Sequence, residues 1–315
     1  MKKISIVVPI YNESNNINKL FLSLQSVIVT IPHVRWEYIF VNDGSIDDSC
    51  TQLRKLLQAH SNITILDFSR NFGKEVALTA GVHEAVNSDA VICIDADLQH
   101  PPELIPKLVN KWEDGAEIVE CIRLDTVNQA FLRKIGSLTF YWLMNKISGI
   151  KMNVNTTDFR LYDKIVIKSF ILATERNRIF RGIMDWMGYR HATIEFTAGI
   201  RSNDQVASYS YIKLFNLAVN SLTAFSLWPL KITGYLGLLI STISGSLAFW
   251  MMISYVVQTH FNYTPLAIFV VLNTFLIGLT LIAIGLVAFY VGIIHTEVLN
   301  RPLYIIRARI TNDSK

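Results

Sequence analysis

The chain has 315 residues, 51% of them hydrophobic, and carries a formal net charge of +4. This length suits one large domain with an additional segment, and the modest charge gives no support for a nucleic-acid partner. The hydrophobic residues are unevenly distributed: residues 1–210 have the mixed composition of a globular domain, whereas residues 232–257 and 267–293 contain no charged side chain. The three cysteines lack metal-ligand spacing, and we expect them to be reduced thiols.

Four short apolar runs alternate with helical patterns along the first 112 residues, and we expect the runs to be strands. The runs cover residues 4–10, 36–43, 63–69 and 90–97, and the helical patterns cover 16–29, 45–60, 74–86 and 101–112. Continuous apolar strands that alternate with helices are typical of a doubly wound, mainly parallel α/β sheet. The first run is not followed by GxGxxG and no P-loop sequence occurs, which argues against a dinucleotide-binding fold and a P-loop enzyme.

Polar side chains lie at or just after the end of each of these four runs. They are Asn12 and Glu13, Asn42 and Asp43, Arg70 and Asn71, and Asp95 and Asp97. The carboxyl ends of parallel strands meet at one edge of a sheet, where ligands bind. We therefore expect a binding site at this edge, although each residue alone is also an ordinary turn former or helix cap.

The sequence CIDADLQHPP, residues 93–102, contains the strongest metal-binding pattern. In an extended chain, Asp95, Asp97 and Gln99 point to the same side, so that three oxygen ligands converge. Few, hard oxygen ligands suit Mg²⁺ or Mn²⁺ bound together with a substrate diphosphate. The alternative is that Asp97 only caps a helix that begins near Pro101 and Pro102.

Residues 232–257 and 267–293 each have the length of a helix that crosses a membrane. The alternative is a pair of core helices in a soluble protein. Lys213 and Lys231 precede the first segment, three arginines follow the second, and the loop between them has neither Lys nor Arg. This bias predicts a two-helix transmembrane hairpin, within residues 231–295, with both termini in the cytoplasm.

Two further segments adjoin this expected hairpin. Residues 211–230 alternate polar and apolar positions at helical spacing and include Trp228. They are expected to form an amphipathic helix at the membrane interface, the alternative being a core helix of the globular domain. Residues 296–315 are expected to be a basic cytoplasmic tail.

Six ordered motifs and the two apolar segments resemble those of the polyprenyl-phosphate glycosyltransferases of glycosyltransferase family 2. The motifs are VVPIYNE, VNDGSIDDS, DFSRNFGKEVALTAG, DADLQHPPELIP, TDFRLYDK and ERNRIFRGIMDWMGY, and the chain also contains RPLY near its end. Within this family, the motifs resemble those of the bactoprenol glucosyltransferase branch. The resemblance implies a GT-A domain in residues 1–210 and a multi-pass protein of the inner (cytoplasmic) membrane, often a tetramer.

The resemblance also implies an activity. It is the metal-dependent transfer of one hexose, glucose from a UDP-linked donor in this branch, onto undecaprenyl phosphate with inversion, for cell-envelope glycan modification. Other sugars and nucleotides stay open.

The same resemblance assigns roles to individual residues. Nucleotide-sugar binding falls to Pro9, Tyr11, Glu13, Asp43, Arg70, Lys74 and Asp95; metal binding to Asp95, Asp97 and Gln99; acceptor-phosphate binding to Arg123, Arg133, Ser137 and Arg201; and catalysis to Asp97 and Asp158. Asp158 could act as a general base or could orient an arginine such as Arg160. Arginine suits phosphate binding through its permanent charge and bidentate geometry.

The sequence departs from the family pattern on the acceptor side. The stretch after Arg201 lacks the family's G-x-S-K, Thr157 replaces a glycine, and Phe289 replaces an acid. These departures leave a second interpretation, a membrane-anchored nucleotide-sugar-binding protein or partner subunit without transfer. A processive polysaccharide synthase is less consistent with the sequence, because neither a QxxRW motif nor further apolar segments occur.

Overall fold

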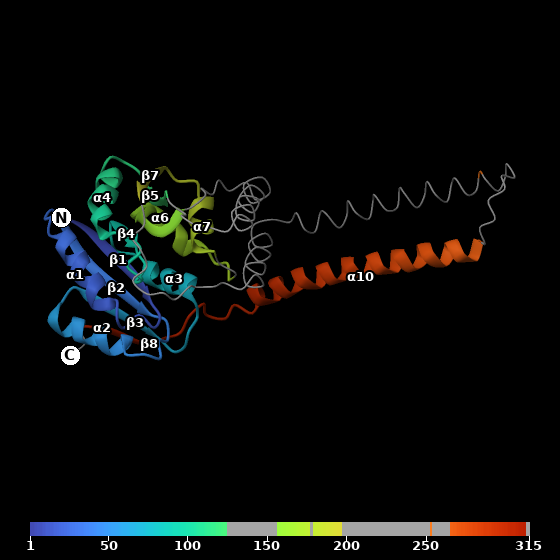
Figure 1. Cartoon of the computed structure of the whole chain (residues 1–315), viewed down its shortest axis with the longest axis horizontal. Coiled ribbons are helices and arrows are strands. Elements are labelled where there is room, and N and C mark those ends of the chain that lie inside the picture. The colour runs from blue at the N-terminus through green and yellow to red at the C-terminus, as the bar shows by residue number, and fades with distance from the viewer. Residues whose placement is uncertain (125–155, 177–178, 197–252, 254–264, 313–315) are drawn as a thin grey trace. The chain divides into compact units, whose positions relative to one another are not determined.

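The computed structural model describes residues 1–124, 156–176, 179–196, 253 and 265–312 (Figure 1). The chain divides into two compact units, one formed by Met1–Ser210 with Arg301–Lys315 and the other by Tyr211–Asn300. The first unit contains an eight-stranded sheet with the strand order β7-β5-β6-β4-β1-β2-β3-β8.

The centre of this sheet is parallel, as the sequence predicts. It consists of β1 (Lys2–Ile10), β2 (Val34–Asn42), β3 (Ile63–Phe68) and β4 (Ala90–Cys93), and β1 pairs with both β2 and β4. The outer strands make the sheet mixed. They are β5 (Ile118–Arg123), β6 (Thr156–Asp163), β7 (His191–Phe196) and β8 (Ile306–Thr311). β6 runs antiparallel to β4 and β5, and β8 runs antiparallel to β3.

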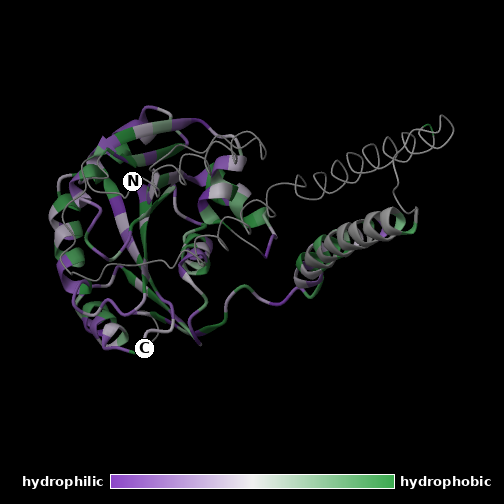
Figure 2. Cartoon of the chain, turned by 45° about the vertical axis from the view of Figure 1, so that its right-hand side comes forward, coloured by the Kyte–Doolittle hydropathy of each residue, from purple (hydrophilic) through white to green (hydrophobic). Residues whose placement is uncertain are grey.

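Helices cover both faces of the sheet. On one face lie α1 (Ile17–Ile28), α2 (Ser49–Ala59), the short 3₁₀ helix η1 (Pro102–Leu104) and α4 (Ile105–Glu113); on the other lie α3 (Lys74–Glu84), α6 (Lys164–Leu172) and α7 (Phe180–Trp186). α1 buries Ile17, Leu20, Phe21 and Leu24, which share one side of a helix. These side chains belong to the same core cluster as alternate residues of β1. Figure 2 colours the ribbon of the described residues by hydropathy.

α3 approaches the sheet closely because Gly81 has no side chain. A Cβ at this position would lie 2.2 Å from Val7 Cγ1 in β1, so a larger residue would require either the Val7 side chain or the helix to move. Residues 77–82 of this helix are all buried. The close approach places the first residue of α3, Lys74, beside the carboxyl ends of the central strands.

The first unit contains a strand that the sequence does not predict. Residues 296–315 are expected as a basic tail, yet residues 306–311 form β8 and close the edge of the sheet beside β3. Ala308, Ile310 and Thr311 of β8 are only partly buried, and two of its three exposed residues are arginines, so the sequence of this segment resembles a polar tail. Its partner edge is supplied by a strand about 240 residues earlier, which local patterning cannot reveal.

The expected membrane hairpin stays a prediction. Residues 211–230 lie outside the described residues, as does the expected span 232–257 apart from Ile253. The expected span 267–293 falls within α10 (Pro265–Val298), which is helical throughout. In the part of the chain that the structure describes, no helix is both long enough and apolar enough to cross a membrane.

Candidate functional site

A pocket of about 240 Å³ lies at the carboxyl ends of β1, β2 and β4, where the sequence places a binding site. Its lining residues come from the ends of these strands and from the loop before α3. They are Pro9, Ile10, Tyr11, Glu13, Asp43, Asn71, Gly73, Lys74, Asp95, Ala96 and Asp97. Six of the residues assigned to nucleotide-sugar binding therefore share one pocket, together with Asp97.

One wall of the pocket is acidic. Burial raises the pKa of Glu13, and the neighbouring carboxylates of Asp97, Asp47 and Asp95 raise it further, while a hydrogen bond from Asn16 Nδ2 at 2.6 Å opposes this change. Like charges this close disfavour one another unless a cation lies among them. Asp95 and Asp97 bring to the pocket carboxylate oxygens, the ligands that a hard divalent cation such as Mg²⁺ or Mn²⁺ prefers, and Lys74 Nζ lies 2.6 Å from Asp95 Oδ1.

The backbone between Asp95 and Gln99 is not the extended chain that the sequence suggests. β4 ends at Cys93, residues 96 and 97 form a turn, and Leu98 has a φ of 62°. The expected alternation of side chains is therefore wrong: Asp95 and Asp97 line the pocket, whereas Gln99 is not among its lining residues. The Gln99 Oε1 atom instead lies 3.5 Å from Arg123 Nη1.

Asp97 does not cap the helix that follows. Its Oδ1 accepts a hydrogen bond of 3.1 Å from the backbone N–H of Gln99, which stabilises the turn. The 3₁₀ helix η1 begins after Pro101 without a side-chain cap. The capping alternative is thus wrong, and Asp97 lines the pocket.

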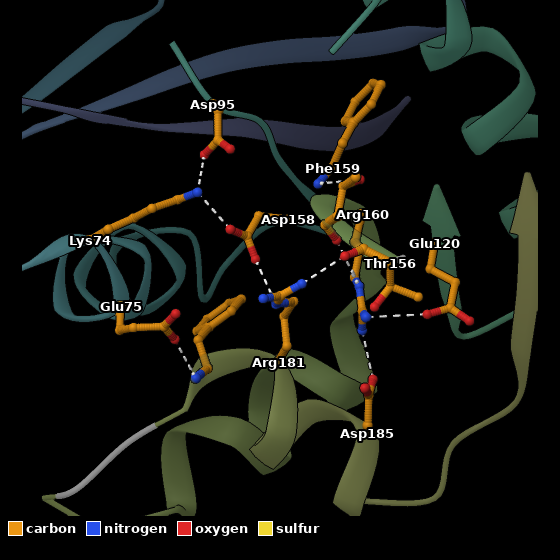
Figure 3. A network of polar contacts seen from close by, with 12 residues as sticks. Lys74, Glu75, Asp95, Glu120, Thr156, Asp158, Phe159, Arg160, Arg181 and Asp185 are labelled. Carbon is orange, nitrogen blue, oxygen red and sulfur yellow. Dashed lines mark hydrogen bonds and ion pairs between the residues drawn. The ribbon is translucent and has the colours of Figure 1, made fainter. Parts of the chain in front are cut away.

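Lys74 connects the acidic wall to a second aspartate (Figure 3). Its Nζ lies 2.6 Å from Asp95 Oδ1 and 2.5 Å from Asp158 Oδ2. Burial alone would lower the pKa of Lys74, but the two carboxylates raise it, so the ammonium group stays charged. Because the Lys74 side chain is still 43% exposed, solvent weakens both ion pairs.

Asp158 is held by two cations. Besides Lys74, Arg181 Nε lies 3.0 Å from Asp158 Oδ1, and Arg181 Nη1 donates to the backbone oxygen of Thr156 at 2.7 Å. Burial raises the pKa of Asp158, but Arg181 and Lys74 outweigh it and lower the value to about 2. An aspartate that holds its proton this weakly is a poor general base near neutrality.

Arg181 was not singled out in the sequence, although it belongs to the motif ERNRIFRGIMDWMGY. The structure shows how it reaches the site: Glu75 Oε2 accepts a hydrogen bond of 2.5 Å from Phe180 N, which fixes the start of α7 beside α3. The arginine that Asp158 orients is therefore Arg181, whereas the sequence suggested Arg160. Two arginines in neighbouring motifs could not be distinguished without the fold.

Arg160 is fully buried and belongs to a second cluster of charged side chains (Figure 3). Its guanidinium lies 2.6 Å from Asp185 Oδ1 and 3.2 Å from Glu120 Oε2, and its Nε donates to Thr157 O at 3.1 Å. Glu120, Asp185 and His191 are close enough together to suggest a metal site. Since Arg160 already neutralises both carboxylates, we interpret this cluster as an ion-pair network of the core.

Asp43 organises the loop that precedes α3. Its two carboxylate oxygens accept hydrogen bonds from Phe72 N at 2.6 Å and Gly73 N at 2.9 Å. Burial raises the pKa of Asp43, and these two hydrogen bonds counteract the effect. Gly44, with a φ of +65°, leaves room for the same loop, because a Cβ there would lie 2.4 Å from the backbone of Arg70.

The remaining expected site residues are divided between described and undescribed parts of the chain. Arg70 is exposed, lies over the Phe72 ring at 4.7 Å and does not line the pocket. Arg133, Ser137 and Arg201 lie outside the described residues. Thr157, which replaces the family glycine, donates a hydrogen bond to Cys121 O at 3.0 Å and so joins β6 to β5.

The fold and the strand-end pocket define a mixed α/β domain of the GT-A type. The structure is similar to mannosyl-3-phosphoglycerate synthase from Rubrobacter xylanophilus, with a TM-score of 0.51 and 13% sequence identity, over 71% of this chain and 72% of that one. At this identity the likeness concerns the fold alone.

Sequence relationships are closer. Residues 5–171 match the family model Glycosyl transferase family 2. The chain is 38% identical to the SfII prophage-derived bactoprenol glucosyl transferase of Shigella flexneri, over 97% of both chains. It is also 38% identical to the uncharacterized glycosyltransferase sll0501 of Synechocystis sp., over 96% of this chain and 94% of that protein. The chain therefore belongs to glycosyltransferase family 2.

Proposed function

We propose that the protein transfers one sugar, glucose from UDP-glucose, to undecaprenyl phosphate. The observation that carries this proposal is the similarity along the whole chain to a bactoprenol glucosyl transferase, which extends through both apolar segments. The acidic pocket at the strand ends supports it, because a nucleotide sugar brings a diphosphate that a divalent cation can bridge to carboxylates.

In this proposal the pocket holds the donor and its metal ion. Pro9, Tyr11 and Asp43 contact the nucleoside side, and Asp95 and Asp97 hold Mg²⁺ or Mn²⁺. When bound, the ion stabilises the negative charge that develops on the departing nucleoside diphosphate. Lys74 lies beside Asp95 and contributes a further positive charge on the donor side.

The reaction is a displacement at the anomeric carbon. A phosphate oxygen of the acceptor forms the new bond to this carbon, the bond to the nucleoside diphosphate breaks, and the anomeric configuration is inverted. The acceptor phosphate is already anionic near neutrality, since its second pKa is about 6, so it needs cations to hold it more than a base to activate it. Arg123, Arg133, Ser137 and Arg201 are proposed for that task, and Asp158 positions Lys74 and Arg181.

The acceptor lipid implies a membrane setting. We propose that residues 232–257 and 267–293 cross the inner membrane, that residues 211–230 lie at its cytoplasmic surface, and that both termini are cytoplasmic. The lengths of the two charge-free segments and the distribution of basic residues around them support this topology. A homotetramer, as in the resembling branch, is part of the same proposal.

The test is direct assay of the purified full-length protein. It is incubated in detergent with undecaprenyl phosphate, Mg²⁺ or Mn²⁺ and a panel of radiolabelled nucleotide sugars, and the lipid extract is examined for a labelled product. We expect product with UDP-glucose, abolished by Asp97→Asn and retained by Asp114→Asn, an exposed aspartate at the end of α4. Binding of UDP without product from any donor would favour the alternative, a nucleotide-sugar-binding partner subunit.

A further inference from the structure

The segment that follows α10 returns to the first unit and contacts the loop that forms one side of the donor pocket. This loop, residues 69–73, is called the donor loop below; with Lys74 it contributes three lining residues, and Asp43 binds it from one side. Of the residues that the structure describes, those at 301–312 do not line the pocket. Their contacts are with the first residue of the donor loop and with the elements on either side of it.

Tyr304, the last residue of RPLY, provides the central contact. Its ring stacks on Phe68 at the end of β3, with ring centres 5.3 Å apart and planes 11° from parallel. Phe68 in turn contacts the edge of Phe72, at 5.6 Å and 89°. The Tyr304 hydroxyl is 3.1 Å from His83 Nδ1 in α3, so one side chain touches the strand before the donor loop and the helix after it.

Backbone contacts reinforce this arrangement. Ser69 N donates to Ile305 O at 3.0 Å, and Arg307 Nη2 donates to Ser69 O at 2.8 Å. The β3–β8 ladder has an irregular register between Asp67 and Phe68, at the point where the donor loop begins. Ser69, the first residue of the loop, is thus bound through both its N–H and its carbonyl oxygen.

We propose that Tyr304 and Arg307 are positioning residues for donor binding, which hold the donor loop in the shape that the nucleotide sugar requires. Phe72 N and Gly73 N can satisfy Asp43 only when the loop keeps this path. A loop clamped between Asp43 and the segment 301–307 loses little conformational entropy when a ligand binds. The predicted effect on nucleotide binding rests on the proposed function, whereas the predicted effect on the ordering of the donor loop does not.

Amide hydrogen exchange of the full-length protein, measured by mass spectrometry, tests the loop itself. We expect Tyr304→Ala and Arg307→Gln to speed exchange in the peptide that covers residues 69–74, and Tyr304→Phe, which keeps the ring stacking, to change it less. Arg309→Gln is the matched control. Arg309 lies on the same strand as Arg307 but pairs with Glu84 of α3, at 2.6 Å. If this peptide exchanged at the wild-type rate in both Tyr304→Ala and Arg307→Gln, the proposal would be overturned.

Calorimetric titration with UDP and Mn²⁺ tests the consequence for binding. Loss of one aromatic pair predicts affinity about 2- to 10-fold weaker for Tyr304→Ala, with the control unchanged. Faster exchange with unchanged UDP affinity would overturn the positioning role. If the wild-type protein does not bind UDP, the proposed donor is wrong, and the exchange measurement still decides whether the segment 301–307 orders the loop. If Tyr304→Ala fails to fold, Tyr304→Phe and Arg307→Gln decide the question.

Discussion

Replacement of Asp158 by Asn tests whether this aspartate is a base or an anchor for two cations. The carboxylate lies between Lys74 and Arg181 and is only 13% exposed. Its pKa falls from an ordinary value of 3.8 to about 2. At roughly 1.4 kcal/mol for each pH unit, this difference corresponds to folding stability on the order of 2 kcal/mol.

The sign of the pH dependence follows from the depressed pKa. The stabilisation is fully present above about pH 4, where Asp158 is ionised in the unfolded chain as well as in the folded protein. It is lost as the pH falls toward 2 and the folded protein also binds the proton. We expect Asp158→Asn to lower the free energy of unfolding at pH 7 by roughly 2 to 3 kcal/mol. Urea unfolding followed by tryptophan fluorescence measures this, with Asp114→Asn as the exposed control.

The rate profile separates the two roles of Asp158. As an anchor, Asp158 titrates far below the assay range. The profile of transfer rate between about pH 5 and pH 9 then reports the acceptor phosphate, with its pKa of about 6. Asp158→Asn should lower the rate without changing the shape of this profile. A general base would contribute its own acidic limb. Disappearance of such a limb in Asp158→Asn would refute the reasoning from the pKa.

Two further predictions concern stability and the donor loop. Arg160→Met leaves two buried carboxylates without their cation and should destabilise the protein by about 3–5 kcal/mol in urea unfolding; a smaller loss than in Asp158→Asn would contradict the assigned network. Gly44→Ala forces a Cβ to within 2.4 Å of the donor loop and should abolish UDP binding in calorimetry. Gly115→Ala, also at positive φ but with no atom within 4 Å of the Cβ, should lose stability and keep UDP affinity.

Much of the fold follows from local patterns in the sequence. The four parallel strands are predicted because each is a continuous apolar run, as strands covered on both faces must be. The pocket follows from the polar residues at the ends of these strands. What the sequence misses are contacts between distant segments, such as the pairing of β8 with β3 and that of Arg181 with Asp158.

The error at residues 95–99 has a local cause. Alternation of side chains holds only while the chain is extended, and here Leu98 adopts a positive φ immediately after Asp97. A leucine rarely takes this conformation, so the composition of the segment gives no sign of the turn. The two aspartates still reach the pocket, because the turn itself lies at the end of β4.

The late position of β8 in the chain has a consequence for biosynthesis. The edge of β3 can be paired only after residues 306–311 leave the ribosome, and residues 211–300 are translated before them. Until then, an unpaired strand edge is exposed in the nascent protein, a state that invites aggregation. For the same reason, a chain shortened at residue 210 to obtain the first unit alone would expose this edge and lose Tyr304, and appending residues 301–312 through a flexible linker should restore both.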